Sequence, residues 1–138
     1  MTILLVEDHQ DTRETLQRLL TKRGHTVLGA GDVKSALDLA WATPCDLLMC
    51  DLQLPDGDGY QLLRALASQR EIMAVAMSGH CALSDLIRTK AAGFLTHLIK
   101  PYGIADVQSA LALVQRELDA RRQGGQNNDP RNQPGSGN

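Results

Sequence analysis

The chain has 138 residues, a charged fraction of 22% and a formal net charge of −2. This length suits one domain with a sound hydrophobic core, and the charge balance gives no basic surface of the kind that binds nucleic acid. The N-terminus lacks the features of a signal peptide, and no apolar run approaches the roughly 18–20 residues of a membrane helix. We therefore expect a cytoplasmic domain that contacts neither nucleic acid nor a membrane directly.

The N-terminal part of the chain alternates short apolar runs with segments of helical periodicity. Two strands are predicted here, at residues 2–6 and 26–30. The helix between them begins near Asp11 or Thr12, either of which can cap it, and stops at Gly24. Asp32 caps the next helix, and Pro44 marks its end. The expected inner faces of these two helices are Leu16, Leu19 and Leu20, and then Val33, Ala36, Leu37, Ala40 and Trp41.

The same alternation continues through the rest of the chain. Three further strands are predicted at residues 46–50, 72–77 and 95–99, and three helices at about residues 60–68, 83–92 and 104–122. The strand at 46–50 is apolar at nearly every position, as expected for a central parallel strand that is covered on both faces. Gly93 closes the helix before the last strand. The inward-facing residues of the three helices are Leu62, Leu63, Leu66, Val107, Ala110, Leu111, Val114 and Leu118.

Strands that alternate regularly with helices predict an α/β fold. We expect a doubly wound, flavodoxin-like sheet of five parallel strands with five helices and right-handed connections. The folded domain should cover residues 1–122. From Gln123 onward the composition changes to Gly, Asn, Gln, Pro and Ser without apolar residues, so residues 123–138 are predicted to form a disordered tail.

The three cysteines, Cys45, Cys50 and Cys81, are odd in number and lie in apolar segments. No Cys-x-x-Cys pair or paired histidine spacing accompanies them, so neither a disulfide framework nor a zinc site is expected. We interpret them as buried, reduced side chains.

Chemically active side chains follow four of the five predicted strands. Glu7 and Asp8 follow the first strand, Asp51 the third, Ser78 the fourth and Lys100 the fifth. In such sheets the carboxyl ends of the strands meet at one edge, where ligands bind. Three carboxylates packed together repel one another unless a cation joins them, and oxygen ligands alone select Mg²⁺ or Mn²⁺. The alternative is that these acids are ordinary surface caps of neighbouring helices, which suits each one singly but not the whole set.

This arrangement predicts phosphoryl chemistry. The Asp51 carboxylate is placed to act as a nucleophile that forms an acyl phosphate. Lys100 supplies a second cation, and the Ser78 hydroxyl can donate a hydrogen bond to a phosphoryl oxygen.

Four short motifs occur in this order along the chain, and together they are far more specific than any one alone. They are Leu5-Val6-Glu7-Asp8, Asp51-Leu52-Gln53-Leu54-Pro55-Asp56-Gly57, Met77-Ser78-Gly79 and Ile99-Lys100-Pro101. At these residues the chain resembles the receiver domain of two-component signalling, and the resemblance covers about residues 2–122.

The resemblance implies a role for each matching residue. Asp51 is the phosphoacceptor, Asp8 and Glu7 hold Mg²⁺, with Glu7 acting through a water molecule, and the backbone carbonyl of Gln53 completes the protein ligands. Mn²⁺ is the alternative ion.

The same resemblance implies that Lys100 and Ser78 contact the phosphoryl group and that the Lys100–Pro101 peptide bond is cis. In the family an aromatic residue three positions before the lysine responds to the movement of the hydroxyl residue, but here that position is His97. Either His97 takes this switch role with a titratable ring, or backbone movement reshapes the output surface, or His97 faces solvent without any role.

The implied function is that of a phosphoacceptor switch and not of an enzyme. The phosphoryl donor would be a histidine kinase or a histidine phosphotransfer domain, and a downstream effector protein would read the face formed by the fourth helix, fifth strand and fifth helix. This face should contain Lys90, His97 and Asp106, and could also mediate a phosphorylation-dependent dimer. Local similarity favours a receiver attached to a hybrid sensor histidine kinase, or a stand-alone receiver, over part of a transcription factor.

Other readings fit the residues less well. A phosphatase of the haloacid dehalogenase type needs an acid/base aspartate where this chain has Gln53. A flavin phosphate would be repelled by Glu7 and Asp8, and the segment 56–59 lacks the ligand spacing of a calcium loop and is expected to be a turn. A pseudo-receiver that only binds proteins remains the main alternative.

Overall fold

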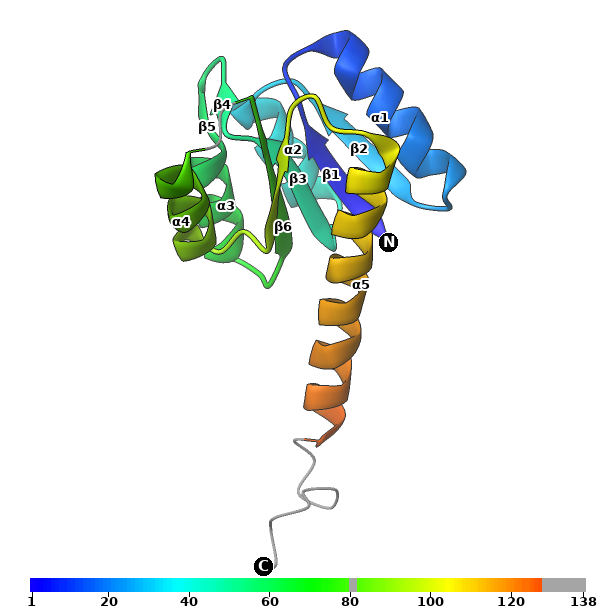
Figure 1. Ribbon diagram of the computed structural model, residues 1–138. Coiled ribbons are helices and arrows are strands. Elements are labelled where there is room, and N and C mark those ends of the chain that lie inside the picture. Colours follow the sequence, from blue (N-terminus) through cyan, green and yellow to red (C-terminus); the bar gives the residue numbers. More distant parts are fainter. Residues whose placement is uncertain (80–81, 128–138) are drawn as a thin grey trace, which may run out of the picture.

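The computed structural model describes residues 1–79 and 82–127, and contains one central parallel sheet (Figure 1). Its strands are β1 (Thr2–Val6), β2 (Thr26–Ala30), β3 (Leu47–Asp51), β6 (Met73–Ser78) and β7 (Thr96–Ile99), in the order β2-β1-β3-β6-β7. The helices are α1 (Gln10–Lys22), α2 (Val33–Ala42), α3 (Gly59–Ala67), α4 (Leu83–Ala92) and α5 (Ile104–Asn127). The predicted fold class is therefore confirmed.

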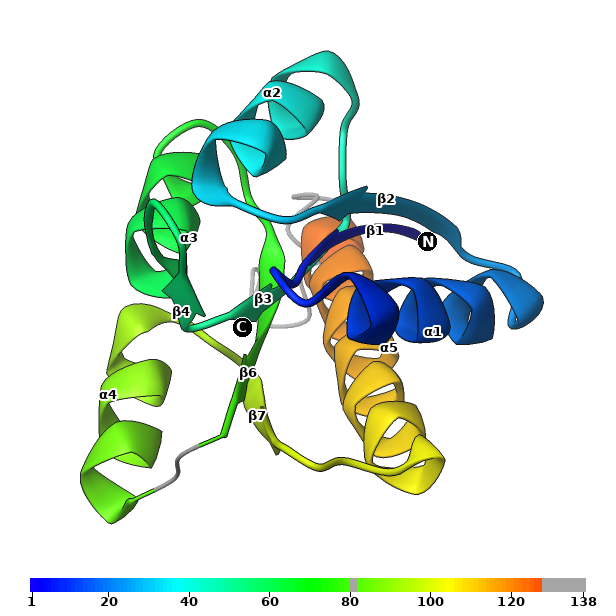
Figure 2. The same ribbon diagram turned by 90° about the horizontal axis from the view of Figure 1, so that it is seen from above.

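Helices cover both faces of the sheet (Figure 2). Along β1, Ile3 and Leu5 point to one face and Leu4 and Val6 to the other, because successive side chains of a strand alternate. The first face packs against α1 and α5, and the second against α2 and α3. All four of these β1 side chains are fully buried, so the sheet lies between two separate hydrophobic cores.

The helix ends agree only in part with the sequence analysis. Asp32 caps α2 as predicted, since its Oδ1 accepts a hydrogen bond from the Ser35 amide at 2.7 Å. Gly93 ends α4 with φ of +107°, a left-handed conformation that glycine adopts without steric cost. The predicted cap of α1 was wrong, because His9 holds that position and its ring Nδ1 accepts from the Thr12 amide.

Trp41 does not belong to the inner face of α2, contrary to the prediction. Its side chain is 49% exposed, and the guanidinium carbon of Arg70 lies 5.8 Å from its ring centroid. The residues of α2 that are buried against the sheet are Ala36 and Ala40. These two small side chains form the buried contact of the helix, and the indole of Trp41 lies outside it.

A short antiparallel hairpin, β4 (Gln53–Leu54) and β5 (Gly57–Asp58), follows β3 where only a turn was expected. The turn itself contains Asp56, whose two carboxylate oxygens accept hydrogen bonds from the amides of Val33 at 2.7 Å and Lys34 at 3.0 Å. These are unpaired amides of the first turn of α2. Asp56 therefore fastens the hairpin to α2.

The remaining differences are boundary shifts. Strand β3 runs to Asp51, one residue further than predicted, and α5 continues to Asn127 instead of ending at Arg122. Residues 128–138 of the predicted tail, and Cys81, lie outside the described residues. Cys45 and Cys50 are free and buried, as expected. Among the described residues, no helix has the length and apolar character needed to cross a membrane.

Candidate functional site

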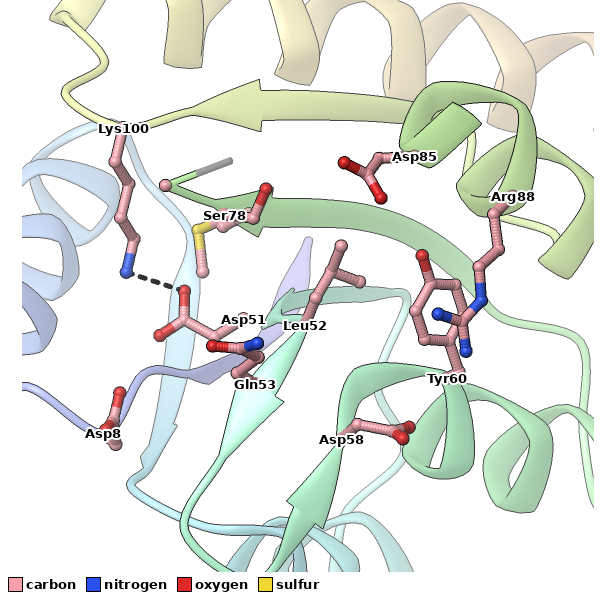
Figure 3. Close-up of a pocket in the computed structure, with 12 residues that line it drawn as sticks. Asp8, Asp51, Leu52, Gln53, Asp58, Tyr60, Ser78, Asp85, Arg88 and Lys100 are labelled. Carbon is pink, nitrogen blue, oxygen red and sulfur yellow. Dashed lines mark ion pairs between the residues drawn. The ribbon is translucent and has the colours of Figure 1, made fainter. Parts of the chain in front are cut away.

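The carboxyl ends of the central strands bring the predicted site residues together (Figure 3). Asp51 is the last residue of β3 and lies in register with Met77 on β6. Glu7 follows β1, where its amide donates to the Ala30 carbonyl at 3.0 Å. The Lys100 amide donates to the Ser78 carbonyl at 2.8 Å, which joins the end of β7 to that of β6. The topology of the sheet thus assembles groups that are distant in sequence.

Lys100 links two of the carboxylates directly. Its Nζ lies 2.7 Å from Glu7 Oε1 and 2.9 Å from Asp51 Oδ1. The contact to Asp51 is an ion pair outside hydrogen-bond geometry, whereas the contact to Glu7 is also a hydrogen bond. Glu7 is fully buried and Asp51 is 4% exposed, so this cation offsets the cost of holding carboxylates away from water.

The two buried carboxyl groups differ strongly in acidity. Burial raises the pKa of Asp51 to about 8, with the Glu7 carboxylate adding to this effect and Lys100 opposing it. Burial would raise the pKa of Glu7 as well, but hydrogen bonds with Asp51 and Lys100 lower it to about 2. The pair therefore shares one proton near neutral pH, with Glu7 ionised beside Lys100.

A divalent cation could replace this shared proton and neutralise the clustered carboxylates. Glu7, Asp8 and Asp51 each offer a carboxylate oxygen, and these atoms lie within 4.8 Å of one another. The donors are all oxygens, as Mg²⁺ or Mn²⁺ requires. Asp8 is exposed while the other two are buried, so the group opens to solvent on the side of Asp8.

A cavity of about 490 Å³ lies over these carboxylates and contains most of the predicted site. Asp8, Asp51, Gln53, Ser78 and Lys100 all line it. Gln53 belongs to the hairpin, in which it pairs with Asp58. The Lys100–Pro101 peptide bond is cis, as expected.

The sequence analysis missed four residues at the far end of this cavity. They are Asp58, Tyr60, Asp85 and Arg88. The guanidinium carbon of Arg88 lies 4.1 Å from the Tyr60 ring centroid, so α4 and α3 meet there through a cation–π contact. Asp58 and Asp85 were detectable as helix-start residues, but no sequence pattern links Arg88 to the cavity.

Ser78 is hydrogen-bonded to His97. The Ser78 Oγ lies 2.7 Å from His97 Nε2. Burial lowers the pKa of His97, which the charge of Asp85 partly opposes, so the ring is neutral at physiological pH. The other ring nitrogen, Nδ1, is buried without a partner among the described residues. The ring therefore does not face solvent, and its role as a switch remains a prediction.

The surface expected to carry the output is made of α4, β7 and α5. Lys90 and Asp106 on this surface are exposed, and His97 is half-buried beneath it. Among the described residues, the large exposed hydrophobic side chains other than Trp41 all belong to these three elements: Leu83, Leu86, Ile87, Ile99, Ile104 and Leu113.

The fold and the site define a phosphoacceptor domain, and the comparisons with known proteins agree. The family model of the response regulator receiver domain matches residues 3–112. The chain therefore belongs to the response regulator receiver family, whose members act as phosphoacceptor switches.

Individual relatives support this assignment. The chain is 34% identical over 118 residues to the KDP operon transcriptional regulatory protein KdpE of Escherichia coli, covering 86% of this chain and 52% of KdpE. It is 28% identical to sporulation initiation phosphotransferase F of Bacillus subtilis, covering 79% of this chain and 89% of that protein. The chain thus spans about half the length of the first curated relatives.

Solved structures give the same result. A CheY-like response regulator receiver domain from Methylobacillus flagellatus is 29% identical, with a TM-score of 0.73, over 83% of this chain and 98% of that one.

Proposed function

We propose that Asp51 accepts a phosphoryl group from a phosphohistidine donor and that the resulting acyl phosphate switches the α4-β7-α5 surface. The observation that carries this proposal is the contact of Lys100 with both Asp51 and Glu7 at the floor of one open cavity. Lys100 can face a phosphoryl oxygen, but the three carboxylates outnumber it once Asp51 is ionised. A divalent cation in the cluster is therefore needed before the site accepts a dianionic phosphoryl group.

The proposed reaction uses Asp51, Lys100 and Ser78. An oxygen of Asp51 attacks phosphorus, the P–N bond of the donor breaks, and its electron pair stays with the leaving imidazole. Lys100 stabilises negative charge on the phosphoryl oxygens, and the Ser78 hydroxyl turns to donate to one of them. Because burial and Glu7 raise the pKa of Asp51, the attacking carboxylate must first lose the shared proton.

Asp8, Asp51 and the Gln53 backbone carbonyl would hold Mg²⁺ directly, and Glu7 through a water molecule. The ion, when bound, neutralises charge on the carboxylates and on the phosphoryl oxygens. The all-oxygen cluster of Glu7, Asp8 and Asp51 supports this role.

The proposed donor is a histidine kinase or a histidine phosphotransfer domain, and an effector protein reads the switched surface. We favour a receiver of a hybrid histidine kinase or a stand-alone receiver. Phosphotransfer profiling against a panel of kinases and phosphotransfer domains identifies the donor.

Replacing Asp51 tests the central step. Asp51→Asn should abolish labelling by acetyl phosphate in the presence of Mg²⁺, because the amide cannot form the acyl phosphate. The matched control is Asp38→Asn, which makes the same chemical change at an exposed position of α2 and should label like the wild type. Equal labelling of Asp51→Asn would refute the assignment.

The same experiment separates the alternatives. A pseudo-receiver that only binds proteins would not label at all. A phosphatase would release phosphate in many turnovers, whereas Gln53, which lines the cavity, cannot act as an acid or base.

A further inference from the structure

The backbone of Glu7 is fixed on both sides. Its amide donates to the carbonyl of Ala30, at the end of β2, at 3.0 Å. Its carbonyl accepts a hydrogen bond from Arg13 Nη1, at 2.7 Å, on the first turns of α1. This carbonyl belongs to the peptide unit that joins Glu7 to Asp8, so the guanidinium determines the orientation of that unit.

Two glycines make room for the Arg13 side chain. A Cβ atom on Gly31 would lie 3.2 Å from Arg13 Nη1 and 4.0 Å from the Glu7 carbonyl oxygen. A Cβ atom on Gly29 would lie 3.5 Å from Arg13 Cδ, an ordinary van der Waals distance. The Arg13 side chain therefore lies against these two glycines at the end of β2. A methyl group at Gly31 would press on its guanidinium.

The Glu7–Asp8 peptide unit matters because it carries two of the three clustered carboxylates. The Glu7 side chain is held independently, by Lys100 Nζ at 2.7 Å and by the His9 amide at 3.2 Å. No described hydrogen bond or ion pair holds the Asp8 side chain, which is exposed. The direction of Asp8 thus depends on the backbone that Arg13 holds.

We propose that Arg13 is a positioning residue for the cation site: by holding the Glu7 carbonyl, it aims the Asp8 carboxylate at Asp51. This proposal rests on the proposed function, because it assumes that the cluster binds Mg²⁺. Arg13 itself touches neither the ion nor the phosphoryl group.

The proposal is testable because the charge of Arg13 and its positioning of Asp8 have opposite effects on Mg²⁺ affinity. As a nearby cation, a guanidinium repels Mg²⁺, so its removal would tighten Mg²⁺ binding if charge were its only effect. As a positioning group, it brings Asp8 into the site, so its removal weakens binding.

Mg²⁺ alone is titrated calorimetrically into the wild type, Arg13→Ala and Arg13→Lys. We expect Arg13→Ala to raise the Kd about threefold to tenfold and Arg13→Lys, which keeps a donor, to recover part of the loss. In the metal-free protein, the amide NMR signals of Asp8 and His9 should shift in Arg13→Ala, while signals of the hairpin stay in place. An unchanged or tighter Kd in Arg13→Ala would overturn the proposal.

A pair of glycine variants tests the same contact without removing the arginine. Gly31→Ala should weaken Mg²⁺ binding, because its methyl group displaces the guanidinium. Gly29→Ala is the control, since it presses instead on the Gln17 side chain, with Oε1 at 2.9 Å, and should bind like the wild type. Equal binding by both variants contradicts the proposal, whereas a wild type that does not bind Mg²⁺ overturns the proposed function as well.

Discussion

Asp51 is the residue whose charge state links stability to function. In the metal-free protein, burial and the Glu7 carboxylate oppose its ionisation. Ionisation is nevertheless what nucleophilic attack requires. A cation that replaces the proton therefore both completes the site and removes a source of instability.

This conflict predicts an unusual pH dependence of stability. The pKa of Asp51 is about 8 in the folded protein and about 3.9 in an unfolded chain, so the folded state binds an extra proton between these values. Metal-free stability should therefore fall as pH rises from about 4 to 8. For Glu7, whose folded pKa is about 2, stability is gained as pH rises from about 2 to 4.

Thermal unfolding in a chelating buffer between pH 5 and 8 checks this prediction. Asp51→Asn should remove the decline and stabilise the protein at pH 8 by on the order of 1–3 kcal/mol, a rise in Tm of several degrees. Mg²⁺ should stabilise the wild type at pH 8 far more than the variant. A wild-type Tm that increases steadily to pH 8 without metal would contradict the assigned acidity.

The hydrogen bond between His97 and Ser78 gives a second prediction at the residue scale. Its Nε2 bonds to the Ser78 hydroxyl, so the movement of Ser78 toward a phosphoryl group breaks that bond. His97→Ala should remove a hydrogen bond worth about 1 kcal/mol and tighten binding of beryllofluoride with Mg²⁺ several-fold. If His97 is the switch, the amide shifts that this ligand causes on α4, β7 and α5 should also be lost.

The matched variant is His97→Gln, whose amide can still reach the Ser78 hydroxyl and should retain part of the response. Unchanged affinity and unchanged surface shifts in His97→Ala would remove His97 from the mechanism and leave backbone movement as the route to the surface.

At the scale of elements, the hairpin β4–β5 depends on α2 for its placement. Asp56 bonds to two amides of α2 across 22 and 23 positions of sequence, and Gln53 at the cavity lies in the same hairpin. The mobility of the Gln53 carbonyl should therefore depend on the contact of Asp56 with α2, although Asp56 itself does not line the cavity.

Asp56→Ala tests this dependence. Loss of the two hydrogen bonds to the helix start should cost about 1–2 kcal/mol of unfolding free energy, measured by urea denaturation. It should also weaken Mg²⁺ binding through Gln53. Asp38→Ala, on the exposed side of α2, is the control and should leave both quantities nearly unchanged. Full Mg²⁺ affinity in Asp56→Ala would mean that the hairpin holds its shape alone.

The sequence predicted the elements better than their details. Apolar runs located all five strands of the main sheet to within one residue at both ends, and parallel topology alone brought Glu7, Asp51 and Lys100 together. Periodicity failed at Trp41, because hydrophobicity does not reveal that the buried contact of α2 consists of Ala36 and Ala40. It failed for Arg13 and Arg88 too, since their partners are a carbonyl and a ring from other elements.

At the scale of the whole molecule, the large exposed hydrophobic side chains of the described residues, apart from Trp41 on α2, all belong to α4, β7 and α5. Leu83 and Ile87 on α4, Ile99 on β7 and Ile104 on α5 are between 47% and 73% exposed. An apolar surface of this kind is a typical protein-binding site. His97 on β7 is hydrogen-bonded to Ser78, which lines the cavity, so it connects this surface with the site.

Beryllofluoride with Mg²⁺ should therefore shift amide NMR signals over α4, β7 and α5, in addition to those around Asp8 and Asp51. The signals of α2 near Trp41 should stay in place and serve as the internal control. Sedimentation velocity on the same samples checks the proposed phosphorylation-dependent dimer. A response restricted to the cavity would mean that the surface does not sense the site.

The positions of the site residues along the chain have a consequence for biosynthesis. Lys100 comes from the last strand of the sheet and meets Glu7, 93 residues earlier. A nascent polypeptide on the ribosome therefore has no competent acceptor until nearly the whole domain has emerged and closed its sheet. Under the proposed function, phosphorylation of Asp51 therefore requires a chain whose last strand has joined the sheet.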